Sequence, residues 1–199
     1  EGYPQECVDH HVFQSDDGMW HLWGCVRGTK VGRILYHWRS DSLTKSNWEK
    51  TGEIIRASRP DGESIHNHEG GEFIQSPYVV KHNGEYFMFY GGHNTGFNKD
   101  GERIDDRDEK KMESQMCLMR SKDGRNWVRH KNENGQSSIF VGPGETRDPA
   151  LIQIDGIWHM YYAGYEYPRG NETRNELVSG FWVRTSEDLI NWSEKKLVH

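Results

Sequence analysis

The sequence predicts an all-β protein built from repeated four-stranded antiparallel units. Three stretches share the same order of features: a short polar segment, an apolar run, an Asx-Gly turn and an aromatic run that ends in glycine. They begin at Asp9, Ser76 and Asp148, which we call the head residues. Self-similarity of this kind indicates an internal repeat. No helical periodicity of comparable length competes with it.

Each repeat opens with a predicted β-hairpin. An Asx-Gly pair between two apolar runs favours a tight hairpin, because a type I′ turn needs positive φ at both central residues. The three turns lie at Asp17-Gly18, Asn83-Gly84 and Asp155-Gly156. The head residues therefore stand at the start of the first strand of each repeat.

A second hairpin follows the first in each repeat. A third apolar run leads into a Ser/Asp-rich turn, and an Asn-Trp pair then opens a fourth strand. These pairs begin at Asn47, Asn126 and Asn191. The segment 195–199 is the predicted fourth strand of the last repeat. Four antiparallel strands in sequence order describe one blade of a β-propeller.

The repeats predict a single β-propeller domain over 1–199, complete or partial, with about three blades at approximately 8–57, 73–131 and 146–199. Closed propellers usually have about four to eight blades. We therefore expect further blades, or a homo-oligomer, to complete the ring. Because strand direction alternates, the head residues and all the long loops share one side of the propeller. Ligands are expected to bind on that side.

Composition restricts the partners. The net charge of −6 and the absence of a basic block argue against nucleic acid. No run of about 18 apolar residues exists, so no membrane-spanning segment is predicted. The cysteines Cys7, Cys25 and Cys117 lack metal-type spacing, and they form either a Cys7–Cys25 bridge or three separate thiols. Cysteine leaves the compartment open, and we favour a secreted or periplasmic location.

Carboxylates at the heads are the candidates for catalysis. Asp9 and Asp148 occupy the same position in their repeats, beside the predicted central axis. Two carboxylates in one pocket are the minimum for glycoside hydrolysis. The alternative is that Asp148 caps the strand and pairs with Arg147. Ser76 supplies no carboxylate, so Glu72 is the third catalytic candidate, with a solvated loop charge as its alternative.

Other side chains on the same side are candidates for binding a carbohydrate substrate, through hydrogen bonds or ring stacking. They are Arg147, His10, His11, Gln75, Trp23, His93 and Glu166. Core packing is the alternative for the aromatic residue. His10, His11, His66 and His68 match no zinc spacing, and the charged loop 99–111 lacks EF-hand spacing. Neither a metal nor a cofactor is predicted.

Several motifs resemble a known superfamily. The repeated heads, Arg147-Asp148-Pro149 and the Ser-x-Asp…Trp turns resemble the five-bladed propeller glycoside hydrolases of families 43 and 32, including β-fructosidase-like proteins. The Asp9–Phe13 opening and Gln75–Val80 look like a bacterial subset of that superfamily. The resemblance covers nearly the whole chain.

The resemblance implies hydrolysis of a glycosidic bond in an oligo- or polysaccharide. Asp9 would match the nucleophile or base, and Asp148 would match the aspartate that stabilises the transition state. The general acid of these families is a glutamate, usually in Glu-Cys-Pro or Glu-x-Pro at a blade head, and no such motif follows Asp148. Glu6-Cys7 is followed by Val8. The alternatives are a non-catalytic carbohydrate-binding propeller and a propeller used for protein interaction.

Overall fold

The computed structural model describes residues 4–63, 71–93, 114–142, 146–166 and 178–199. Within this part the chain forms strands, and one 3-10 turn, η1 (Arg59–Asp61). The side chains of residues 93, 165, 166 and 178 lie outside the described part. No helix among the described residues is long and apolar enough to cross a membrane.

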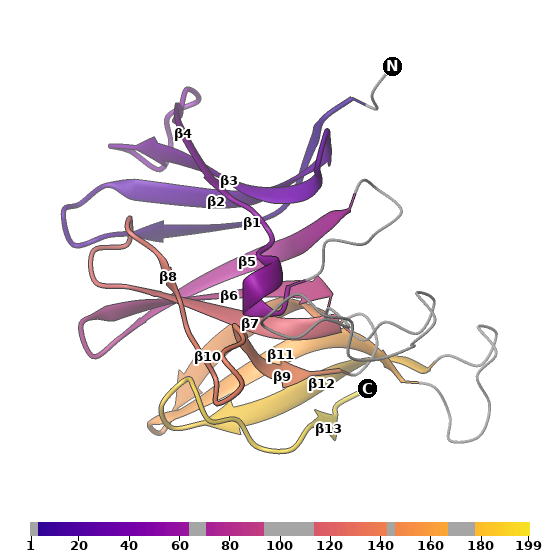
Figure 1. The fold of residues 1–199 in the computed structure, drawn as a ribbon. Helices are drawn as coiled ribbons and strands as arrows, with labels where there is room; N and C mark the ends of the chain where they lie inside the picture. The colour runs from indigo at the N-terminus through magenta and orange to yellow at the C-terminus, as the bar shows by residue number, and fades with distance from the viewer. Residues whose placement is uncertain (1–3, 64–70, 94–113, 143–145, 167–177) are drawn as a thin grey trace.

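The strands form three antiparallel units that follow one another in space as in sequence (Figure 1). Blade 1 contains β1 (Glu6–Gln14), β2 (Trp20–Thr29), β3 (Gly32–Ser40) and β4 (Glu49–Ile55). Blade 2 contains β5 (Glu72–His82), β6 (Glu85–His93), β7 (Ser114–Ser121), β8 (Val128–Arg129) and β9 (Ser138–Val141). Blade 3 contains β10 (Arg147–Ile154), β11 (Ile157–Glu166), β12 (Val178–Ser186) and β13 (Lys196–Leu197).

Two of the predicted tight turns have the expected backbone. Asn83 and Gly84 have φ of 49° and 77°, and Asp155 and Gly156 have 50° and 83°. The first hairpin instead has a longer loop, 15–19, in which Gly18 has a φ of 82°. A type I′ turn needs positive φ at both central residues, and this explains the Asx-Gly pairs at Asn83-Gly84 and Asp155-Gly156.

The fourth strand of blade 2 differs from the expected single strand ending near residue 131. It is divided into β8 and β9, which both pair with β7, and it ends at Val141. A loop separates the halves. In that loop the side-chain oxygen of Asn132 accepts hydrogen bonds from the backbone N–H groups of Asn134 and Gln136. The loop therefore has its own internal stabilisation, and the strand resumes after it.

A short parallel pairing joins blades 1 and 2, with Gly32 opposite Glu72 and Arg33 opposite Phe73. A Cβ atom at Gly32 would lie 2.3 Å from the carbonyl oxygen of Glu72, and Gly32 has a φ of 111°. Both facts require glycine at this close approach.

Blade 2 lies between two hydrophobic clusters. Along β6, Tyr86, Met88 and Tyr90 pack in the cluster shared with blade 1. Phe87 and Phe89 point to the other side and pack in the cluster shared with blade 3. Because side chains alternate across a strand, a blade buried on both faces needs apolar residues at every position. The run of aromatic and apolar residues at 86–90 in β6 is the result.

The three cysteines are free. Cys7 lies opposite Val26, whereas Cys25 lies opposite Val8, so the two side chains project from opposite faces of the hairpin. Cys7 is exposed and Cys25 is buried. The Cys7–Cys25 bridge is therefore excluded by strand register, and separate thiols are the correct alternative.

Candidate functional site at the blade heads

The three head residues share one unusual backbone conformation. Asp9, Ser76 and Asp148 have φ of 39°, 54° and 56°. At each of them the pairing of the first two strands of the blade shifts register. A non-glycine residue with positive φ is uncommon and strained, and a bulge redirects the side chain at that position. The same local device therefore recurs at the start of all three blades.

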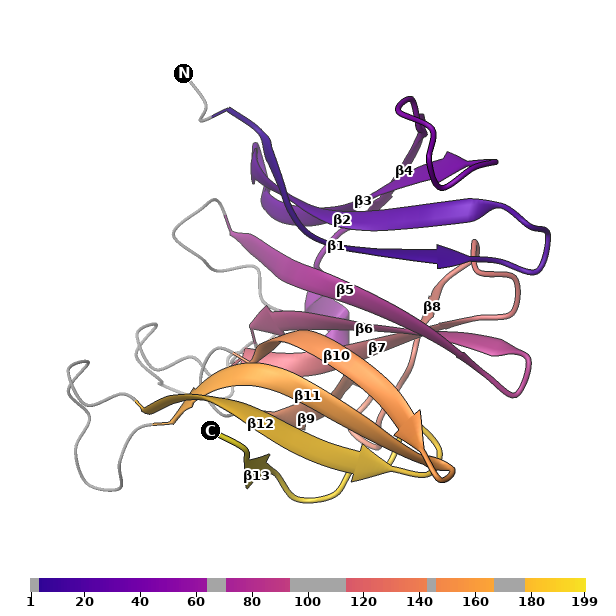
Figure 2. The same cartoon turned by 180° about the vertical axis from the view of Figure 1, so that it is seen from behind.

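The three heads meet although they are far apart in sequence. The Ser76 hydroxyl donates to Asp148 Oδ1 at 2.7 Å and lies 3.3 Å from Asp9 Oδ2. Ser76 is separated from Asp9 by 67 positions and from Asp148 by 72. These two distances place the two carboxylate oxygens no more than about 6 Å apart. Figure 2 shows the arrangement that permits this, with β5 lying between β1 and β10.

Asp148 has a second neighbour besides Ser76, and this one is charged. Arg147 Nε lies 3.4 Å from Asp148 Oδ2, and the Asp148 side chain is 49% exposed. The expected Arg147–Asp148 pair is therefore present together with the contact to Ser76. Both oxygens of Asp148 face a donor group, and the carboxylate remains open to solvent. Asp9 is also exposed.

Glu72 interacts with a different partner from the three head residues. Its carboxylate accepts a hydrogen bond from Arg56 Nε at 2.9 Å, and its side chain is 12% exposed. The described structure records no contact between Glu72 and the head residues. Glu72 is not a solvated loop charge either, since it opens β5 with a largely buried side chain that pairs with the exposed Arg56. A catalytic role for Glu72 stays a prediction, and its carboxylate is engaged by Arg56.

Two further candidates are held by interior contacts. Gln75 is 2% exposed, and its side-chain oxygen accepts a hydrogen bond from Arg33. Trp23 is 2% exposed and stacks on His37 with ring centroids 4.7 Å apart. Its ring belongs to the core and offers no face to a sugar, so the packing alternative is correct for Trp23. Gln75 adjoins Ser76 and supports the head from within the strand.

The two neighbouring histidines differ. His10 is exposed beside Asp9. His11 packs on Tyr78 with ring centroids 4.1 Å apart, and burial lowers the pKa of His11 to about 4. His11 is therefore a neutral ring at the contact between blades 1 and 2. His93 and Glu166 end β6 and β11, and their side chains lie outside the described residues, as do His66 and His68.

Ser76 is the site residue that the sequence pattern had not indicated. It lacks a charge, so the repeat pattern alone assigns it no part in catalysis. A usable signal was present, because Ser76-Pro77 aligns with Asp148-Pro149. Among the described residues, no group of three or more His, Cys, Asp or Glu side chains could hold a metal ion.

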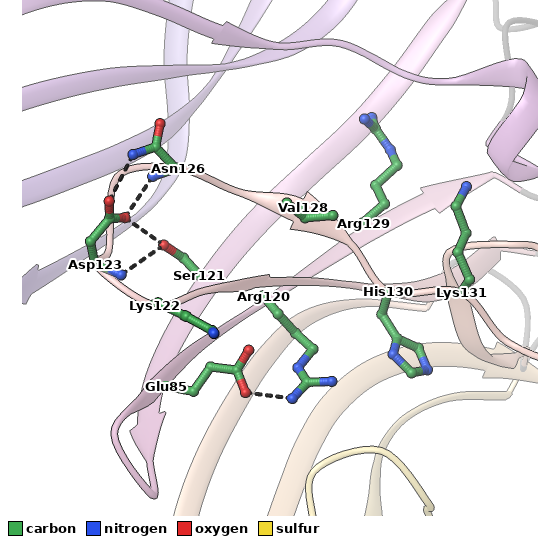
Figure 3. Close-up of a pocket in the computed structure, with 10 residues that line it drawn as sticks. All are labelled: Glu85, Arg120, Ser121, Lys122, Asp123, Asn126, Val128, Arg129, His130 and Lys131. Atoms are coloured by element: carbon green, nitrogen blue, oxygen red, sulfur yellow. Dashed lines mark hydrogen bonds and ion pairs between the residues drawn. The ribbon is translucent and has the colours of Figure 1, made fainter.

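A cavity of about 540 Å³ lies on blade 2, away from the heads. Figure 3 shows that it is lined from β7, β8 and the turn between them, and Arg120 forms an ion pair with Glu85 there. None of the three head residues lines it. The cavity is therefore not the candidate site.

The arrangement of the three blades defines a fold class: it is that of part of a β-propeller like those of glycoside hydrolases. No protein-family model and no curated protein matches the sequence. Solved structures match nearly the whole chain. A family 32 β-fructofuranosidase from Bombyx mori has a TM-score of 0.64 at 18% identity over 97% of this chain and 35% of its own.

Two other solved structures give the same result. A thermostable family 43 glycoside hydrolase has a TM-score of 0.62 at 18% identity, over 100% of this chain and 54% of its own. An α-L-arabinanase from Penicillium chrysogenum, complexed with arabinobiose, has a TM-score of 0.60 at 14% identity, over 96% and 50%. The chain thus spans between about a third and just over half of these three proteins, and at such identities the likeness concerns the fold.

Proposed function

We propose that this chain forms part of a propeller that hydrolyses glycosidic bonds in an oligo- or polysaccharide. One observation carries the proposal: carboxylates from blades 1 and 3, on equally strained heads, converge on a single hydroxyl. Strained backbone persists where the surrounding structure enforces it, and it concentrates at functional sites. The shared fold with a β-fructofuranosidase and an arabinanase supports the same activity class.

The reaction would consume one water molecule. The glycosidic C–O bond breaks, the anomeric carbon gains the water oxygen, and the leaving oxygen gains a proton. Asp9 would attack the anomeric carbon or take the proton from water, and Asp148 would stabilise the positive charge that develops on the sugar ring. Arg147 and His10 lie beside these carboxylates in sequence and would contact sugar hydroxyls.

The proton for the leaving oxygen must come from a third group. None of the three described heads supplies a glutamate. We propose that the general acid stands on a blade that this stretch of chain does not contribute. Blade 3 has a face suited to such a neighbour. Exposed apolar residues occupy it: Ile152, Tyr161 and Phe181. By register they correspond in blade 2 to Val80, which is partly buried, and to Phe89 and Met116, which are buried.

A non-catalytic carbohydrate-binding propeller is the second candidate. The absence of a glutamate among the three described heads favours it, since a pocket without an acid binds sugar but does not release a poor leaving group. The two candidates differ in turnover rather than in affinity, so an assay of both properties separates them.

The test uses Asp9→Asn and Asp148→Asn with an oligosaccharide panel and with 2,4-dinitrophenyl glycosides, whose leaving groups need no protonation. We expect hydrolysis of the activated glycosides, reduced by about 10²–10⁴ in each variant. Equal hydrolysis by the parent and both variants would overturn the catalytic assignment. Sugar binding in the parent with no turnover of any substrate would establish the second candidate.

A further inference from the structure

The Ser76 hydroxyl stands between two acceptors but has one proton to donate. A serine hydroxyl supplies a single O–H donor. The distance to Asp148 Oδ1 is 2.7 Å, within the usual range for O–H···O bonds, whereas Asp9 Oδ2 lies at 3.3 Å, beyond it. The proton therefore belongs to the bond with Asp148.

The surroundings of the two carboxylates increase this asymmetry. The second oxygen of Asp148 faces Arg147 Nε at 3.4 Å. For Asp9, Ser76 is the single hydrogen-bond partner recorded within the described part of the chain. Asp148 is thus held on both oxygens, while the lone pairs of Asp9 remain available. A carboxylate whose lone pairs are not engaged is the better nucleophile or base.

We propose that Ser76 is a positioning residue that assigns the roles of the two aspartates. It holds Asp148 as the fixed stabilising anion and leaves Asp9 as the group that attacks the sugar or activates water. The inference rests on the proposed glycosidase function, and it adds the residue that distinguishes two carboxylates of the same chemical type.

The chain holds this hydroxyl in place. Ser76 is 4% exposed, has a φ of 54° and precedes Pro77. The fixed ring of a proline restricts the preceding residue, so the backbone has little freedom to move the hydroxyl toward Asp9. A neutral donor also suits the position, because a third carboxylate there would repel both neighbours.

A chemical test reads the asymmetry without any sugar. A carbodiimide with a small amine converts reactive carboxylates into amides, and peptide mapping gives the ratio of labelled Asp9 to labelled Asp148. We expect the parent to favour Asp9 by about tenfold, the effect of one hydrogen bond to a charged group. In Ser76→Ala the ratio should fall severalfold toward one, and the remaining Arg147 contact with Asp148 should keep it slightly above one. The exposed Ser46→Ala variant is the control and should keep the parent ratio.

Ser76→Gly separates the hydroxyl from the strained backbone, because glycine accepts positive φ. The proposal expects the same ratio in Ser76→Gly as in Ser76→Ala. A ratio that stays at the parent value in both would overturn it, as would a change in one alone. With a 2,4-dinitrophenyl glycoside, kcat should fall in both variants while KM stays near that of the parent. Turnover absent in the parent would refute the proposed function, and the labelling ratio would still decide whether Ser76 distinguishes the aspartates.

Discussion

At the scale of single residues, a chain of polar groups centred on two buried histidines of blade 1 has the clearest physical consequence. His21 and His37 are each 1% exposed, and His21 Nδ1 lies 2.9 Å from His37 Nε2. Ser15 Oγ lies 2.9 Å from His21 Nε2, and Glu53 Oε2 lies 2.7 Å from His37 Nδ1. Each ring nitrogen thus has a partner while both rings remain neutral, one as donor and the other as acceptor.

This chain predicts a loss of stability in mild acid. Burial lowers the pKa of His21, and it lowers the pKa of His37 to about 3. Arg39 and Arg125 add to the lowering at His37, whereas Glu49 opposes it, and Asp17 and Asp123 oppose it at His21. Between these pH values the unfolded chain therefore binds more protons than the folded chain. The free energy of unfolding is highest above about pH 6.5 and declines toward pH 3.

Urea unfolding at pH 7, 6 and 5 measures this decline. Each buried histidine contributes up to about 1.4 kcal/mol per pH unit in that window. His37→Gln keeps a polar side chain but does not titrate, so its stability should depend less steeply on pH. His199→Gln, at an exposed terminal position, is the control. Parallel curves for the parent and His37→Gln would contradict the prediction.

The candidate site shows which of its residues can be predicted from the sequence and which cannot. Asp9 and Asp148 could be found because they are charged and occupy one position in a repeat. Trp23 could not be separated from a surface aromatic, because the face of a strand that points inward depends on register and on the neighbouring blade. Glu72 could not be assigned either, since its partner Arg56 is 16 positions away and meets it only in the folded chain.

At the scale of elements, two of the three tight turns were predictable from the local sequence, whereas long-range boundaries were not. The Asn83-Gly84 and Asp155-Gly156 turns depend on local φ alone. The division of the fourth strand of blade 2 depends on the Asn132 loop, and the parallel contact of Gly32 with Glu72 depends on how two blades meet. Neither has a periodic signature in the sequence. The connection between blades 1 and 2 belongs to the same category.

That connection is fixed by Glu63, a fully buried carboxylate. It accepts hydrogen bonds from Arg129 Nε at 2.8 Å, from the Ser58 backbone N–H at 2.7 Å and from the Tyr90 hydroxyl. Removing one partner of a buried ion pair leaves the other charge uncompensated. Glu63→Gln should therefore destabilise the chain by about 3–5 kcal/mol in urea unfolding.

The matched control for Glu63 is Glu49→Gln. Glu49 pairs with Arg39 at 2.7 Å, but its side chain is 58% exposed. Exposed pairs contribute about 0–1 kcal/mol. A similar loss of stability in Glu63→Gln and Glu49→Gln would show that burial of the Glu63 cluster does not have the assigned effect.

At the scale of the whole molecule, blade 2 shows what a propeller blade needs on its two faces. Each of its faces is covered by a neighbour, and both are apolar. Blade 3 has the same pattern, but its far face carries Ile152, Tyr161 and Phe181 with exposed fractions of 52%, 39% and 59%. The sequence could predict three blades from three repeats. It could not show which faces remain open, because that depends on the packing partner of each blade.

An apolar face of this kind predicts association of the 199-residue chain through blade 3. Contiguous exposed apolar side chains mark interaction surfaces, because each Å² of apolar surface buried in a contact contributes about 25 cal/mol of favourable free energy. We expect sedimentation velocity to show concentration-dependent self-association of the parent. In Phe181→Asp a charge would have to be buried at the contact, so association should weaken at least about tenfold. Leu43→Asp, at a 50% exposed position in a turn of blade 1, should associate as the parent does. A parent that stays monomeric at every concentration, or equal weakening in both variants, would show that the far face of blade 3 is not the contact.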